Sequence, residues 1–262
     1  MAAIIAAQMY TLREFTRTRH GLEESLKKLH DIGYQAVQLS AVGAMDGETP
    51  EVAAQEAREL LDRYQLRCVA THRPWPRLAE RTEEEIAFHK TLGCNYVAIG
   101  GLPERYAERK AEGYRQFLKD SAPIIAKLKE AGIRFGYHNH AYEFQRIGPG
   151  QRTLFDIFIQ EGSPDFTLEV DVYWAVHAGV NPVRIFEQCP GRVPVIHVKD
   201  KEVVPEGPVM AAVGEGNLDW DSILPAAVQA GVEVYAVEQD VCRRDPFDCL
   251  RSSLQFLSGY RL

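Results

Sequence analysis

The sequence predicts an α/β protein built as a single (β/α)8 TIM barrel domain over residues 1–262. The first observation is alternation, because eight short apolar runs are each followed by a longer amphipathic stretch. The second is spacing: successive runs begin 28 to 39 residues apart, which is the length of a strand, a helix and two loops. The third is that no linker or second domain interrupts the pattern. A chain of 262 residues fits one closed barrel of this kind.

The eight predicted strands are nearly continuous apolar runs, which is typical of parallel strands covered on both faces. They begin near Ile4 (IIAAQMY), Ala36 (AVQLSA), Cys68 (CVATH), Tyr96 (YVAIGG), Arg134 (RFGYHNH), Phe166 (FTLEVD), Pro194 (PVIHVKD) and Glu233 (EVYAVEQD). Between them apolar residues recur with the helical period, as Leu22, Leu26 and Leu29 do after the first strand. Glycines that can end a helix precede four of the strands, at Gly33, Gly93, Gly132 and Gly231.

Charge and cysteine content exclude several classes of protein. Acidic residues outnumber basic ones 37 to 30, a net charge of −7, which disfavours binding to nucleic acid or to an anionic membrane. The five cysteines are odd in number and form no C-x-x-C pair, so we expect reduced thiols rather than disulfides or a zinc ribbon. The opening MAAIIAAQMY lacks a basic segment and is followed by Arg13 and Glu14. We therefore expect neither a signal peptide nor a membrane span, and a cytoplasmic location.

In a parallel barrel the functional face lies at the carboxyl ends of the strands. Polar residues gather at these positions: His72, His138, Asn139, His140, Glu143, Asp171, His197, Lys199, Asp200, Glu238 and Asp240. Carboxylates that converge on one mouth repel each other unless a cation lies between them. A divalent ion with nitrogen and oxygen ligands removes that repulsion, and such ligands suit Mn, Mg, Co or Zn.

Structural roles are the alternatives to this metal site. His197 could be an ordinary core histidine. Asp171 could cap the helix that follows it, and Glu238 could pair with Arg243 or Arg244 at the surface. Because all of these would have to hold together, the strand-end pattern favours the metal site.

Five segments together resemble the sugar phosphate isomerase/epimerase family of xylose-isomerase-like barrels. They are YHNHAYEF (137–144), LEVDVYWAVHAGVNP (168–182), GRVPVIHVKD (191–200), VGEGNLDW (213–220) and VEQD (237–240). The resemblance implies one divalent metal held by Glu, Asp, His and Glu from strands five to eight, which correspond here to Glu143, Asp171, His197 and Glu238. Some relatives carry the first glutamate on strand five itself, where this chain has histidines. If Glu143 does not bind the metal, His138 or His140 is expected to take its place as the first ligand.

The resemblance also implies a reaction. A metal that chelates a carbonyl and the neighbouring hydroxyl of a sugar acidifies the C–H between them and stabilises an enediolate. Glu143 and Glu238 would then be the catalytic base and acid. Return of the proton gives an epimerase or an isomerase, whereas loss of a β-oxygen gives a lyase or dehydratase of the inosose-dehydratase or keto-glycoside type. The ligands alone do not choose between these reactions.

Further side chains are predicted to bind the substrate: His72, Trp75, His140, His177 and Lys199. A helix contact with Trp174 is the alternative for His177, and a salt bridge with Asp200 or Glu215 is the alternative for Lys199. Because the strand ends provide few cations, chiefly Lys199 and Arg73, we expect an unphosphorylated sugar, keto-sugar or cyclitol.

Two other readings fit the barrel less well. Phosphodiester cleavage of the endonuclease IV kind requires three metals and a basic face, and this chain has ligands for one metal and a net charge of −7. A non-catalytic sugar-binding barrel does not require two carboxylate bases. The resembled family contains dimers and tetramers, which leaves a homo-oligomer open.

Overall fold

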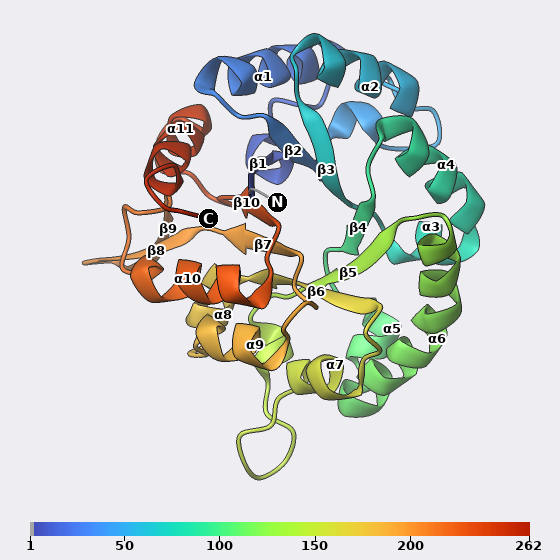
Figure 1. Cartoon of the computed structure of the whole chain (residues 1–262), viewed down its shortest axis with the longest axis vertical. Coiled ribbons are helices and arrows are strands. Elements are labelled where there is room, and N and C mark those ends of the chain that lie inside the picture. Colours follow the sequence, from blue (N-terminus) through green and yellow to red (C-terminus); the bar gives the residue numbers. More distant parts are fainter. Residues whose placement is uncertain (1–2) are drawn as a thin grey trace.

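The computed structural model describes residues 3–262 and shows a closed, eight-stranded parallel barrel that forms one domain (Figure 1). Its strands follow one another around the barrel in chain order, and β1 closes the ring against β10. The barrel strands are β1 (Ile4–Gln8), β2 (Ala36–Leu39), β3 (Arg67–His72), β4 (Tyr96–Ile99), β5 (Arg134–His138), β6 (Phe166–Asp171), β7 (Val195–Val198) and β10 (Val234–Val237). The predicted fold class and all eight predicted strands are confirmed.

Helices ring the outside of the strands (Figure 1). They are α1 (Arg19–Ile32), α2 (Ala54–Arg63), α3 (Trp75–Glu80), α4 (Thr82–Leu92), α5 (Glu104–Ala107), α6 (Lys110–Glu130), α7 (Phe155–Glu161), α8 (Val172–His177), α9 (Pro182–Gln188), α10 (Trp220–Ala230) and α11 (Pro246–Leu257). Short 3-10 turns lie at η1 (Met9–Leu12), η2 (Gly43–Met45) and η3 (Tyr142–Phe144). Gly93 and Gly231 end α4 and α10 in the left-handed conformation, which a residue with a side chain adopts only at a cost. Among residues 3–262, no helix is both long and apolar enough to cross a membrane.

An antiparallel hairpin interrupts the regular pattern after β7. It consists of β8 (Asp200–Val204) and β9 (Gly207–Ala211), which pair only with each other. The buried carboxylate of Asp200 holds the segment that follows, because it accepts hydrogen bonds from the backbone of Gly214 and Leu218 and from Trp220 Nε1. The hairpin was not predicted from the sequence.

The barrel interior is built in layers by the alternation of side chains along each strand. Five alanines, one each from β1, β2, β3, β4 and β10, form its lower part together with a few larger side chains: Ala6, Ala36, Ala70, Ala98, Ala236, Tyr96, Val195 and Val234. Two residues further along each strand, the inward positions become polar, as at Gln8, Gln38, His72, His197 and Glu238. The same alternation that fills the barrel therefore places a polar layer at the carboxyl ends of the strands.

Candidate metal and sugar site

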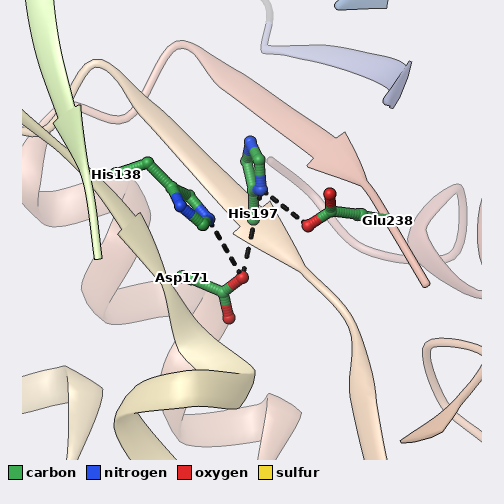
Figure 2. Close-up of side chains that lie close together, drawn as sticks. All are labelled: His138, Asp171, His197 and Glu238. Atoms are coloured by element: carbon green, nitrogen blue, oxygen red, sulfur yellow. Dashed lines mark hydrogen bonds and ion pairs between the residues drawn. The ribbon is translucent and has the colours of Figure 1, made fainter. Parts of the chain in front are cut away.

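Four buried side chains from neighbouring strands converge at the polar end of the barrel (Figure 2). They are His138, Asp171, His197 and Glu238, and a ligand atom from each lies within 4.8 Å of those of the others. His197 Nδ1 is 2.9 Å from Glu238 Oε2 and 3.9 Å from Asp171 Oδ2, while His138 Nε2 is 3.3 Å from Asp171 Oδ2. We call these four potential metal ligands the metal cluster. Three of them were predicted as ligands, and His138 stands where Glu143 was expected.

Asp171 both caps a helix and belongs to the cluster. Its Oδ1 accepts a hydrogen bond of 2.9 Å from the backbone N–H of Trp174 in the first turn of α8, while Oδ2 faces His138 and His197. The capping role weighed from the sequence is therefore real, but it occupies only one of the two oxygens.

Lys199 is fully buried and places its ammonium group against the carboxylates of the site. Lys199 Nζ lies 2.9 Å from Asp171 Oδ2 and 2.8 Å from Asp240 Oδ2, and it also donates to Glu238 Oε2. The inward direction follows from its phase with His197 along the strand. Its partners are not Asp200 or Glu215, the two weighed from the sequence.

The charges in the cluster stabilise one another. Burial alone would lower the pKa of His197, yet Glu238 and Glu169 outweigh it and raise that pKa to about 10. Burial likewise raises the pKa values of Asp171 and Glu238, but Lys199 and the neighbouring histidines bring both below the ordinary range. In the metal-free chain, Lys199 and protonated His197 thus compensate the carboxylates.

A further buried acid, Glu169, lies directly beside the cluster. Glu169 Oε1 is 2.9 Å from His197 Nε2 and also pairs with His72 Nε2, and both of its oxygens accept from Gln38 Nε2 at 3.1 Å. Glu169 was not among the site residues predicted from the sequence. The available signal was its phase in FTLEVD, two residues before Asp171 on the same inward face of the strand.

The structure does not bring Glu143 into the metal cluster. Glu143 is fully buried in the turn η3, where its carboxylate accepts hydrogen bonds from Tyr137 Oη at 2.7 Å and from the backbone N–H of His140 at 2.8 Å. Burial raises its pKa to about 7. His138 takes the inward position at the end of β5, two residues after Gly136, whereas Glu143 lies in the turn that follows the strand.

A cavity of about 400 Å³ opens onto the cluster. His138 and Glu238 line it together with two of the predicted substrate-binding residues, His72 and His140. Burial lowers the pKa of His140 to about 4, so its ring is neutral at pH 7. A larger cavity of about 620 Å³ lies against α7 and α9, but none of the cluster residues line it.

The other three predicted substrate-binding residues, Trp75, His177 and Lys199, do not line this cavity. Trp75 is buried behind the strands, with its ring centroid 4.8 Å from that of Phe117 and 6.3 Å from that of Phe135. His177 is exposed at the end of α8, where it packs on Tyr173 and Trp174, the contact weighed as its structural alternative.

The chemistry of the cluster fits a divalent cation. It offers two imidazoles and two carboxylates, a donor set typical of Mn, Co and Zn sites, whereas Mg prefers oxygen ligands. The side chain of His138 carries a buried ring nitrogen, Nδ1, with no hydrogen-bond partner among residues 3–262. A second arrangement of three potential ligands, His72, Glu169 and His197, shares His197 with the first.

Comparison with known proteins agrees with the fold. Residues 26–258 match the family described as the xylose isomerase-like TIM barrel, and the chain belongs to that family. The resemblance stated from the sequence motifs is therefore confirmed. No protein of curated function matches the sequence significantly.

Solved structures of similar fold cover nearly the whole chain. A sugar phosphate isomerase/epimerase from Parabacteroides distasonis is 23% identical, with a TM-score of 0.82 over 99% of this chain and 94% of its own. An L-ribulose 3-epimerase is 15% identical, with a TM-score of 0.72 over 99% of this chain and 94% of its own. A probable 3-DHS dehydratase from Bacillus anthracis is 12% identical, with a TM-score of 0.68 over 99% of this chain and 100% of its own. At these identities the likeness establishes the fold.

Proposed function

We propose that this protein is a divalent-metal-dependent sugar isomerase or epimerase that acts on an unphosphorylated keto-sugar or related polyol through an enediolate. The observation that carries the proposal is the buried cluster of His138, Asp171, His197 and Glu238, two members of which, His138 and Glu238, line a cavity large enough for a monosaccharide. Isomerases and epimerases among the structural neighbours support the same class of reaction.

The metal cluster would hold the ion, and when bound it would act as a Lewis acid on two adjacent sugar oxygens. His197 is protonated in the metal-free chain, so it must give up its Nδ1 proton before that nitrogen can serve as a ligand. Lys199, which lies 2.8 Å from Asp240 in the metal-free chain, would keep a positive charge beside Glu238 when the ion is bound.

Glu238 is the first proton-transfer group of the proposal. It lines the cavity, and its Oε1 is held by a hydrogen bond of 3.0 Å from Gln8 Nε2. Fixing one oxygen in this way aims the carboxylate at the bound sugar, where it can take the proton from the carbon next to the carbonyl.

The second proton-transfer group lies on the β5 side of the cavity. Glu143 was predicted for this role, but it does not line the cavity, and its carboxylate accepts hydrogen bonds from Tyr137 and from the backbone of His140. His140 lines the cavity and is neutral at pH 7, so its ring can accept a proton from the sugar and, once protonated, return it. We assign proton transfer to His140 and assign to Glu143 the task of holding the His140 backbone in place.

The choice of an unphosphorylated substrate follows from the charges around the cavity. Arg73, the cation in the lining as the structure describes it, already makes two hydrogen bonds of 2.7 Å to Glu85. Lys199 is engaged with three carboxylates, and Asp46, Glu238 and Asp240 also line the cavity. A dianionic phosphate would meet these carboxylates without a free cation to pair with.

Solvent-deuterium exchange tests the proposal. Purified protein is incubated in D2O with Mn²⁺ and a panel of ketoses, aldoses and keto-glycosides, each alongside its phosphorylated form where one exists, and proton NMR follows the C–H next to the carbonyl. We expect wash-in of deuterium with at least one unphosphorylated sugar, abolished by chelator and reduced at least about 100-fold in Glu238→Gln. The surface variant Glu161→Gln is the control and keeps the wild-type rate.

Two further variants separate the roles at β5. If Glu143 only holds the His140 backbone, Glu143→Gln loses less activity than His140→Gln, whereas equal losses in Glu143→Gln and Glu238→Gln would restore Glu143 as the second proton-transfer group. Bound metal without exchange in any sugar would contradict the proposed function.

A lyase or dehydratase is the second candidate, and the dehydratase among the structural neighbours favours it. It would use the same cluster and the same proton abstraction by Glu238, which would then pass that proton to the oxygen that leaves. Appearance of an unsaturated product in the NMR panel, in place of an isomerised sugar, would identify this reaction.

A further inference from the structure

Glu169 is a buried acid that belongs neither to the metal cluster nor to the lining of the cavity, yet it contacts residues of both. It is fully buried on β6, and three donors from three other strands converge on its carboxylate. These donors are His197 Nε2 at 2.9 Å, Gln38 Nε2 at 3.1 Å, and His72 Nε2. Burying a carboxylate this deeply is costly unless such donors satisfy it.

The carboxylate determines which nitrogen of each ring carries a proton. An ionised carboxylate only accepts hydrogen bonds, so the Nε2 atoms of His72 and His197 that face it are both N–H donors. Gln38 strengthens this arrangement, because its Oε1 lies 2.9 Å from His197 Nε2 while its Nε2 points to Glu169. In each ring, Nδ1 is therefore the nitrogen left to contact a partner other than Glu169.

Those two Nδ1 atoms face the functional side of the site. His197 Nδ1 is 2.9 Å from Glu238 Oε2, inside the metal cluster (Figure 2). His72 Nδ1 lies beside Gly100 at the cavity wall, 3.4 Å from where a Cβ on that glycine would stand. The two rings stack with centroids 5.3 Å apart and planes at 14°, so one carboxylate holds both in the same orientation.

We propose that Glu169 is a positioning residue: it holds His197 with Nδ1 toward the metal and His72 with Nδ1 toward the sugar. A carboxylate that accepts the second N–H of a metal-bound imidazole fixes its orientation and makes it a stronger ligand. The same carboxylate thereby sets both the metal affinity of His197 and the orientation of His72 in the cavity wall. This inference rests on the metal site of the proposed function but not on the identity of the sugar.

Metal titration and histidine NMR test the proposal without any substrate. In Glu169→Gln, which keeps the shape of the side chain but removes its charge, we expect affinity for Mn²⁺ or Zn²⁺ to fall by about 10- to 100-fold. Glu85→Gln is the matched control, because Glu85 is an equally buried carboxylate that pairs with Arg73 and Arg77 outside the cluster; its metal affinity stays at the wild-type value.

The spectroscopic readout is the ¹⁵N–¹H correlation of the histidine rings. We expect His72 to carry its proton on Nε2 in the wild-type protein, with or without Zn²⁺, and His197 to do so in the Zn²⁺-bound protein. Glu169→Gln is expected to lose this preference at His72. A merely structural role for Glu169 would not move the tautomer of a ring in a folded variant.

Several results would overturn the proposal. Unchanged metal affinity in folded Glu169→Gln would do so, as would His72 with its proton on Nδ1 in the wild type. Two ions bound per wild-type chain and one per Glu169→Gln chain would make Glu169 a ligand of a second metal instead. If Glu169→Gln does not fold, Glu169→Asp decides, because the shorter side chain withdraws the carboxylate from His197 and His72 while keeping its charge; unchanged affinity there would also refute the proposal.

The outcome is separable from that of the proposed function. A wild-type chain that binds metal but exchanges no sugar proton would contradict the function and leave the role of Glu169 standing. A wild-type chain that binds no metal would remove the metal site, and the tautomer of His72 would still decide whether Glu169 orients the cavity histidine.

Discussion

Removal of the buried Lys199 charge should destabilise the metal-free protein strongly. In Lys199→Met the side chain keeps its length, but Asp171, Glu238 and Asp240 lose the ammonium that lies 2.8 to 2.9 Å from two of them and contacts the third. Removing one partner of a buried ion pair costs about 3 to 5 kcal/mol, because the other partner stays buried without compensation. For a chain of this size, that loss corresponds to a fall in Tm of about 6 to 10 °C.

The assay is urea unfolding at pH 7 in the presence of chelator, followed by circular dichroism. Lys129→Met is the control, because Lys129 pairs with Asp165 at the surface and its loss should change the free energy of unfolding by less than about 0.5 kcal/mol. Saturating Mn²⁺ should restore more stability to Lys199→Met than to the wild type, since a divalent cation can replace the missing charge. A loss below about 1 kcal/mol in Lys199→Met would refute the electrostatic account of the site.

Two other substitutions test parts of the fold outside the site. Glu85→Gln should cost about 3 kcal/mol in the free energy of unfolding, since it leaves the guanidinium of Arg73 without its buried partner. Burial raises the pKa of Glu85, but Arg73 outweighs it and brings that pKa below its ordinary value. The stabilisation from ionised Glu85 is therefore present above about pH 4.5 and is lost as the pH falls through the folded-state pKa. In an acid titration, the free energies of unfolding of the wild type and the variant should converge. Gly136→Ala should cost about 1 to 3 kcal/mol in urea unfolding, because the new Cβ would stand 1.8 Å from Tyr96 Oη inside the barrel. Combining it with Tyr96→Phe should recover part of that loss, and full additivity of the two losses would argue against this clash.

The barrel and most of the site were predictable because both follow from local patterns. Strand alternation predicted which residues point inward, so Asp171, His197, Lys199 and Glu238 were found from their phase and their place at strand ends. The same rule would have selected His138 in place of Glu143, because His138 ends β5 and Glu143 lies in the turn beyond it. The resemblance to family motifs favoured the glutamate, and only the path of the chain through η3 shows that its carboxylate turns to Tyr137.

Other features depend on contacts between distant parts of the chain. The importance of Glu169 arises from Gln38 and His72, which reach it from strands more than 90 residues away in sequence. Trp75 follows a strand end but turns behind the barrel, where Phe117 from α6 covers it. The residues next to Glu169 and Trp75 in the sequence do not indicate these contacts, because closure of the barrel brings their partners to them from distant parts of the chain.

The most direct test of the central claim is equilibrium dialysis of chelator-treated protein against Mn²⁺, with bound metal measured per chain. The account predicts one ion per wild-type chain, and at the same free Mn²⁺ concentration almost none in His197→Gln or Asp171→Asn, each shown to be folded by circular dichroism. Wild-type protein that binds no stoichiometric Mn²⁺, Co²⁺ or Zn²⁺ would contradict the claim and would make the cluster a set of ion pairs around Lys199.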